Sequence, residues 1–171
     1  PPANRGFDPH YDVHDVFVLQ TSGRKHWRVH EPVHRDPLPT QPWTDHRDAI
    51  TARGDDRPVI DTVLEPGDAL YLPRGWVHSA EALGDTSIHL TIGVSAVTTY
   101  DLVRAVMDQL GNVESMRASL PMGNDFTDRD ETAAQATKAI AAAIDVLQNG
   151  TTDLAEGVAS RMSAVHAERT R

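Results

Sequence analysis

The chain has 171 residues and a formal charge of −9, from 25 acidic and 16 basic side chains, which disfavours direct binding to nucleic acid because such binding needs positive charge against phosphates. It contains no cysteine, which excludes disulfides, thiolate metal sites and cysteine nucleophiles. No apolar run reaches the ~20 residues needed to cross a membrane and no signal-peptide pattern is present, so we expect no membrane attachment and a cytoplasmic location.

The first part of the chain, residues 1–97, has the pattern of short β-strands. Three segments each contain two runs in which apolar and polar residues alternate around a turn sequence, and each segment is predicted to form a β-hairpin. These segments are residues 15–31 with the turn TSG, residues 57–73 with PGD, and residues 75–97 with GD. Residues 32–56, rich in proline and charge, are predicted to form a loop. Short strands at this spacing favour a sandwich or a barrel.

The second part, residues 98–171, changes to helical periodicity, with apolar side chains along one stripe of each predicted helix. The predicted helices cover residues 100–110, 128–149 and 151–168. Thr98 and Thr99 can cap the first helix, and Gly111 ends it. Because the stripes are rich in alanine, we expect these helices to pack on the barrel or on a partner subunit rather than to carry chemistry.

The segment GFDPHYDVHDVFVLQ concentrates candidate metal ligands. In an extended strand alternate side chains share a face, so His10, Asp12 and His14 are predicted to face the same side. Fe(II) oxygenases commonly use two histidines and one carboxylate as ligands, leaving other positions open. His78, which follows a tight turn, a strand and a Pro-Arg-Gly loop, is the candidate for the distant ligand. From spacing alone, His10 and His14 are alternatives for the histidine beside Asp12.

Two longer segments, DPHYDVHDVFVLQTSGRKHWRV and LEPGDALYLPRGWVHSAEALGDTSIHLTIGV, resemble the JmjC-type cupin family of ribosomal oxygenases. The resemblance covers about residues 6–97 closely and the helical part more loosely. It implies a mainly β fold with a helical C-terminal part: a double-stranded β-helix barrel over residues 1–97 and a dimerisation region over residues 98–171. The family carries strands before the His-x-Asp motif and a further domain after the helices, so we expect this chain to be a piece of a longer protein.

The resemblance also implies a ligand set and a reaction. It assigns Fe(II) to His10, Asp12 and His78, and the far carboxylate of the cosubstrate 2-oxoglutarate to Lys25. A dicarboxylate needs a fixed cation away from the metal, which supports Lys25, although Arg24 beside it is an alternative. Family members hydroxylate histidine or arginine side chains of ribosomal proteins. A basic ribosomal protein substrate and a homodimer are therefore expected for this chain.

Further residues are assigned to the site on weaker grounds. Thr91 is a candidate hydroxyl partner of the cosubstrate carboxylate. His14, Trp76 and His89 are candidates for lining the substrate site, with packing in the core as the alternative for each. The remaining histidines lie in polar segments and are predicted to be surface residues: His26, His30, His34, His46 and His166. Asp15 and Asp68 are predicted to have structural roles.

Three functions fit this sequence. The first is an Fe(II)- and 2-oxoglutarate-dependent hydroxylase of a ribosomal protein. The second is the same chemistry on a biosynthetic peptide or a small metabolite. The third is a metal-binding cupin without turnover, which Lys25 argues against because a bare metal site needs no anchor for a dicarboxylate. Hydrolase and nucleotide-binding motifs such as G-x-S-x-G, the P-loop and G-x-G-x-x-G are absent from the sequence.

Overall fold

The computed structural model describes residues 8–84 and 86–169, and the chain divides into two units, Pro1–Ala96 and Val97–Arg171. Strands dominate the first unit and helices the second. The elements of the first unit are β1 Asp15–Ser22, β2 Lys25–His30, the 3-10 helix η1 Trp43–His46, α1 Arg47–Gly54, β3 Ile60–Leu64, β4 Ala69–Leu72, β5 Val77–Ala82 and β6 Ile88–Val94.

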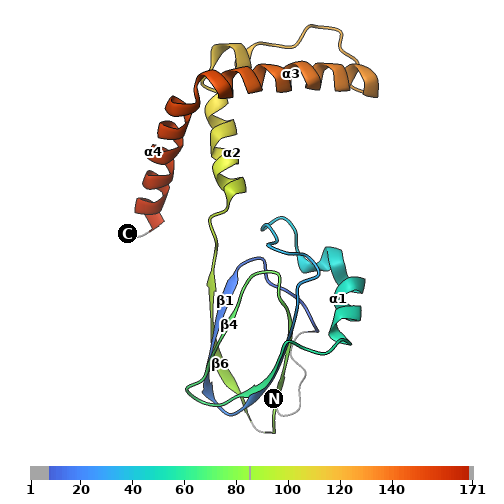
Figure 1. The fold of residues 1–171 in the computed structure, drawn as a ribbon, viewed down its shortest axis with the longest axis vertical. Coiled ribbons are helices and arrows are strands. Elements are labelled where there is room, and N and C mark those ends of the chain that lie inside the picture. The colour runs from blue at the N-terminus through green and yellow to red at the C-terminus, as the bar shows by residue number, and fades with distance from the viewer. Residues whose placement is uncertain (1–7, 85, 170–171) are drawn as a thin grey trace. The chain divides into compact units, whose positions relative to one another are not determined.

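The strands of the first unit form two antiparallel sheets of three strands each, with orders β4-β1-β6 and β3-β2-β5. Alternate residues of β1 and β4 point inward and meet inward residues of β2 and β3, so one apolar core fills the space between the sheets. Its buried members are Val16, Val18, Trp27, Val29, Leu64, Leu70 and Leu72. Figure 1 shows β1, β4 and β6 along one wall of this barrel and α1 on the opposite side. This arrangement is the predicted double-stranded β-helix.

The three predicted hairpins are wrong, although their strands lie where the alternation indicated. In each case the two consecutive strands belong to different sheets: β1 pairs with β4 and β6, whereas β2 pairs with β3 and β5. The turns carry the chain from one sheet to the other. Gly23, in the turn between β1 and β2, has a φ of 64°. A Cβ at this position would lie 2.3 Å from the carbonyl oxygen of Thr86, so the turn requires glycine. Turn residues predict a reversal of direction but not the strand that forms the hydrogen bonds.

The two aspartates predicted to be structural have that role. The Asp15 carboxylate accepts a hydrogen bond of 2.9 Å from the backbone N–H of Arg74, which connects β1 to the loop before β5. The Asp68 carboxylate accepts one of 2.8 Å from the backbone N–H of Glu65 and closes the turn between β3 and β4. Both contacts fix loops at the ends of the barrel.

The predicted loop over residues 32–56 contains a helix that the sequence pattern did not reveal. α1 is short and polar, and its one buried residue is Ile50. Ile50 packs with Tyr11 and Val77 in a second apolar cluster, beside the segment that carries His10. A helix that buries a single side chain has almost no apolar periodicity, so composition predicted a loop instead.

The second unit contains α2 Thr99–Leu110, the 3-10 helix η2 Glu114–Arg117, α3 Arg129–Asn149 and α4 Thr151–Arg169. Thr98 caps α2 in a capping box with Asp101, and Gly111 follows its end, as predicted. α2 and α4 lie side by side (Figure 1), and the Arg161 guanidinium bonds the Asp108 carboxylate at 2.8 Å. Among the described residues, none of the helices is both long and apolar enough to span a bilayer.

Candidate metal centre

Three side chains from two separate segments converge at one end of the barrel. His10, Asp12 and His78 each offer one ligand atom, and these atoms all lie within 4.8 Å of one another. Nε2 of His78 is 3.6 Å from Oδ2 of Asp12, and the two imidazole centroids are 4.5 Å apart. Two imidazole nitrogens and a carboxylate oxygen at these separations can reach a common cation.

The backbone positions these ligands. His10 and His78 form an isolated antiparallel bridge, with N–H to O=C hydrogen bonds of 3.1 Å and 2.8 Å. The bridge attaches the His10 segment to the edge of β5. The backbone N–H of Gly75 donates to the carbonyl of Asp12 at 2.9 Å, which ties the Pro-Arg-Gly loop to the same segment. Gly75 has a φ of 85°, and a Cβ there would lie 2.7 Å from the carbonyl oxygen of His34, so this loop requires glycine.

The prediction of one continuous strand through His10, Asp12 and His14 is wrong. β1 begins at Asp15, and the chain bends at residues 13–14. The His14 imidazole lies against Gly93 of β6, where a Cβ would come within 2.7 Å of it. The bend therefore separates His14 from the pair that the bridge holds, and the structure groups His10, not His14, with Asp12 and His78.

Hydrogen bonds select the tautomer of both imidazoles. Nδ1 of His10 lies 2.8 Å from the carbonyl oxygen of Asp8, and Nδ1 of His78 lies 3.0 Å from that of Trp76. Because a carbonyl can only accept, Nδ1 carries a proton, and in the neutral ring the lone pair is then on Nε2. Burial, and then the neighbouring His10, lower the pKa of His78, which favours the neutral imidazole that a metal binds.

A cavity of about 490 Å³ extends from these ligands into the barrel. Its walls come from both sheets, and apolar side chains separate the metal end from a basic end. The lining residues are His10, Asp12, Val16, Val18, Lys25, Trp27, Leu72, His78, Ala80, His89 and Thr91. In β2, Lys25 pairs with Ala82 and Val29 with His78, so the two ends are four residues apart along the strand, roughly 13 Å at 3.3 Å per residue.

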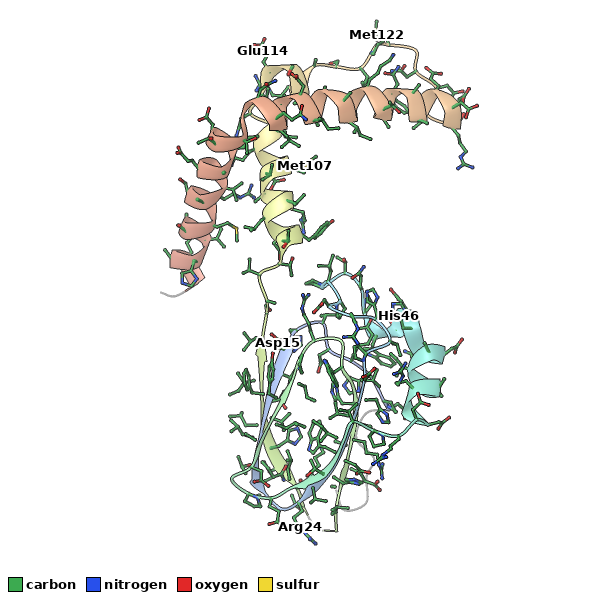
Figure 2. All side chains as sticks on the ribbon, in the orientation of Figure 1. Asp15, Arg24, His46, Met107, Glu114 and Met122 are labelled. Atoms are coloured by element: carbon green, nitrogen blue, oxygen red, sulfur yellow. The ribbon has the colours of Figure 1, made fainter. Side chains whose placement is uncertain are left out.

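Lys25 is the basic group at the far end. It is half-buried, burial lowers its pKa, and Nζ lies 5.6 Å from the centroid of the Trp27 ring. No ion pair of Lys25 is present within the described part of the chain. Arg24, the alternative, is exposed and does not line the cavity. Figure 2 shows Asp15 and Arg24 at opposite ends of the barrel.

The other predicted site residues divide into two groups. Thr91 and His89, on the inner face of β6, line the cavity with Lys25. Trp76 and His14 do not line it: Trp76 packs against the apolar core, and His14 occupies the space over Gly93. The sequence pattern also missed the contribution of Trp27, whose inward position follows from its alternation with Val29.

One surface prediction is wrong. His30, at the end of β2, is only 3% exposed, and burial is the main cause of its lowered pKa. Val29, the residue before His30, points inward, so regular alternation would place His30 on the outer face. Both residues are buried, so the alternation of inward and outward side chains does not hold at the end of β2. His26, His34 and His46 are partly exposed: His26 pairs with Asp61, and the rings of His34 and His46 stack at 4.8 Å.

Comparison with known families and sequences matches residues 1–102 to the JmjC domain. Ribosomal oxygenase 1 of Rattus norvegicus is 45% identical over 114 residues, 63% of this chain and 18% of the rat protein. The Homo sapiens protein of the same name is 39% identical over 134 residues, 75% of this chain and 20% of its own. Bifunctional lysine-specific demethylase and histidyl-hydroxylase NO66 of Drosophila persimilis is 37% identical over 123 residues, 71% of this chain and 17% of its own. The chain thus spans about a fifth of these relatives.

Solved structures are similar at a lower level. Ribosomal oxygenase YcfD from Escherichia coli in complex with cobalt and succinic acid matches 83% of this chain and 35% of its own, with 26% identity and a TM-score of 0.45. The Drosophila melanogaster CENP-C cupin domain matches 54% of each chain, with 18% identity and a TM-score of 0.37. The sequence match is the stronger of the two kinds of similarity.

Proposed function

This chain belongs to the JmjC domain family, and on that basis we propose that it is an Fe(II)- and 2-oxoglutarate-dependent oxygenase that hydroxylates a protein side chain. The observation that carries the proposal is the convergence of His10, Asp12 and His78 at one end of a cavity with Lys25 at the other. A metal site alone has no use for a half-buried cation at the other end of the cavity. A dicarboxylic cosubstrate bound across the cavity uses both.

The donor set fits Fe(II). Two neutral imidazoles and a carboxylate on one side of an ion leave coordination positions open, as the facial arrangement in non-haem iron oxygenases does. The carbonyls of Asp8 and Trp76 hold the two rings in orientation through Nδ1. Within the described ranges, His10, Asp12 and His78 form the one cluster of histidine and acidic side chains that could hold a metal ion.

The cavity fits a short dicarboxylate. The Lys25 ammonium, with the Thr91 hydroxyl, would bind the carboxylate that points away from the metal. Fe(II), when bound, would let O2 oxidise 2-oxoglutarate to succinate and CO2, with one oxygen atom going to succinate and the other into a C–H bond of the substrate. The chain's own residues bind and orient these groups, and the apolar walls formed by Val16, Val18 and Leu72 exclude water.

We propose a ribosomal protein as the substrate, hydroxylated on a histidine or arginine side chain. The names of the sequence relatives, ribosomal oxygenase and histidyl-hydroxylase, support this class. The charge of −9 supports it as well, because an acidic protein attracts basic partners. The same reaction on a biosynthetic peptide or a small metabolite is the alternative.

Mass spectrometry of ribosomal proteins tests the substrate proposal. The protein is incubated with Fe(II), ascorbate, 2-oxoglutarate and ribosomal proteins from its own organism, and we expect one of them to gain a single oxygen atom on histidine or arginine. The Asp12→Ala variant is the matched control. Conversion of 2-oxoglutarate to succinate without an oxidised ribosomal protein would contradict the ribosomal substrate and favour the peptide or metabolite.

We further propose that residues 1–97 are the catalytic barrel and that residues 98–171 mediate homodimerisation. α3 has 21 residues and, among those described, buries none of them. Ile140 and Ile144, one helical turn apart on the same face, are 60% and 48% exposed. Burying such an apolar stripe against a second copy is favourable by about 25 cal/mol per Å².

A charge on this stripe is expected to break the dimer. We expect the wild-type protein to have the mass of a dimer and the Ile140→Asp, Ile144→Asp double variant that of a monomer, because association would bury both carboxylates. Light scattering during gel filtration measures the mass. Lys138→Asp, an exposed position on another face of α3, is the control and should stay dimeric. A monomeric wild-type protein, or a dimeric double variant, would contradict the proposed interface.

A further inference from the structure

The basic end of the cavity contains a second nitrogen base besides Lys25. His89 lies on the inner face of β6, two residues before Thr91, and lines the same cavity. Its ring meets the edge of the Trp27 ring at a centroid distance of 5.9 Å and an angle of 88°. Lys25 lies 5.6 Å from the centroid of the same indole. Trp27 is therefore the wall that both basic side chains share.

Neither basic group has a polar partner in the described part of the chain that would explain its position. No hydrogen bond or ion pair of the His89 ring occurs among these residues, and the same holds for the Lys25 ammonium. The neighbour of His89 on β1, Gln20, makes its hydrogen bonds through Nε2, which donates to the Ser22 and Gly23 carbonyls and to the Ser87 hydroxyl, and its buried Oε1 has no partner among the described residues. Both side chains are half-buried and line the cavity, so a ligand bound there could accept hydrogen bonds from their nitrogen atoms.

The electrostatics agree with this geometry. Burial, and then the Lys25 charge, lower the pKa of His89. The titratable group that faces His89 from the elements around it is Lys25, because Gln20, Trp27 and Thr91 do not titrate near neutral pH. A carboxylate placed between Lys25 and His89 would relieve their repulsion and accept a hydrogen bond from each.

From this arrangement we propose that His89 is a further contact for the far carboxylate of the cosubstrate, beside Lys25 and Thr91, and that it helps to select a 2-oxo acid with two carboxylates. The inference rests on the proposed function, since it assigns a role to His89 in that same cavity. His89 is then a specificity-determining residue for the cosubstrate rather than part of the substrate site.

Binding to the Mn(II)-loaded protein tests the proposal without turnover. Calorimetry compares 2-oxoglutarate with 2-oxopentanoate, the acid of the same length without the second carboxylate. We expect His89→Leu to weaken 2-oxoglutarate binding about 10- to 100-fold, the value of a hydrogen bond to a charged group, and to leave 2-oxopentanoate and Mn(II) binding unchanged. His89→Gln, which keeps an N–H donor, should restore most of the affinity. His26→Leu, on the outer face of β2, is the matched control and should bind both acids normally.

The pH dependence supplies a second readout. A bound carboxylate raises the pKa of the adjacent imidazole, so the complex holds more protons than the free protein and affinity for 2-oxoglutarate rises as the pH falls through neutral. His89→Gln should reduce this slope, while titration of the metal ligands is common to both proteins and cancels in the comparison.

The outcomes separate this proposal from the one it rests on. If His89→Leu weakens both acids equally, or neither, His89 only shapes the cavity and the inference is overturned, whereas the proposed function stands if Lys25→Ala still weakens 2-oxoglutarate. If the wild-type protein with Mn(II) binds neither acid, both proposals are overturned.

Discussion

Replacing Asp12 or His78 with alanine is expected to abolish 2-oxoglutarate turnover and to weaken Mn(II) binding by at least about 100-fold. Loss even of a residue that only orients a metal ligand costs 10- to 100-fold in affinity, and these changes remove a ligand itself. In His78→Ala the backbone bridge to His10 can persist, because it uses main-chain atoms. Turnover is followed by succinate formation, Mn(II) binding by calorimetry, and folding by circular dichroism.

Two further variants separate this site from its neighbours. His14→Ala should keep Mn(II) binding, because His14 packs over Gly93, whereas His10→Ala should lose it. Asp61→Ala removes an exposed carboxylate of the same unit and should bind Mn(II) like the wild-type protein. Normal turnover in Asp12→Ala, or loss of Mn(II) binding in His14→Ala but not in His10→Ala, would overturn the assigned ligands.

The strands could be predicted from the sequence, but their partners could not. The alternation in β1 and β2 is regular because each strand has one face on the core, and this also predicts that Lys25, Trp27 and Val29 face inward together. The turn after β1 has the composition of a hairpin turn. Its packing against the carbonyl of Thr86 is a long-range contact that no local pattern encodes.

In the metal site, too, the local sequence pattern identified the candidate ligands, but contacts with distant residues select among them. Spacing left His10 and His14 as equal alternatives beside Asp12, because parity assumes that the strand continues. The bridge from His10 to His78 and the bend at residues 13–14 decide between them, and the bridge depends on β5, more than sixty residues away. The surface prediction for His30 failed for the same reason: the segment that follows it is rich in proline and charge, but its neighbours in space bury it.

Lys25→Ala is expected to raise the concentration of 2-oxoglutarate needed for half-maximal turnover about 10- to 100-fold while changing the requirement for iron little. The Lys25 ammonium is half-buried, and burial lowers its pKa because the charged form loses water. A carboxylate beside it replaces that water, and a hydrogen bond between such charged groups contributes about 1.5–3 kcal/mol. Titrations of turnover against 2-oxoglutarate and against Fe(II) separate the two effects.

Arg24→Ala is the matched control, because it removes the adjacent cation from an exposed position that does not line the cavity. It should leave both requirements unchanged. Lys25→Arg keeps the charge but replaces a compact ammonium with a planar group of different reach, so it should recover only part of the affinity. Equal increases in the requirements for 2-oxoglutarate and Fe(II) in Lys25→Ala would instead mean that Lys25 supports the barrel as a whole, and the cavity would then lack the cation that distinguishes an oxygenase from a bare metal site.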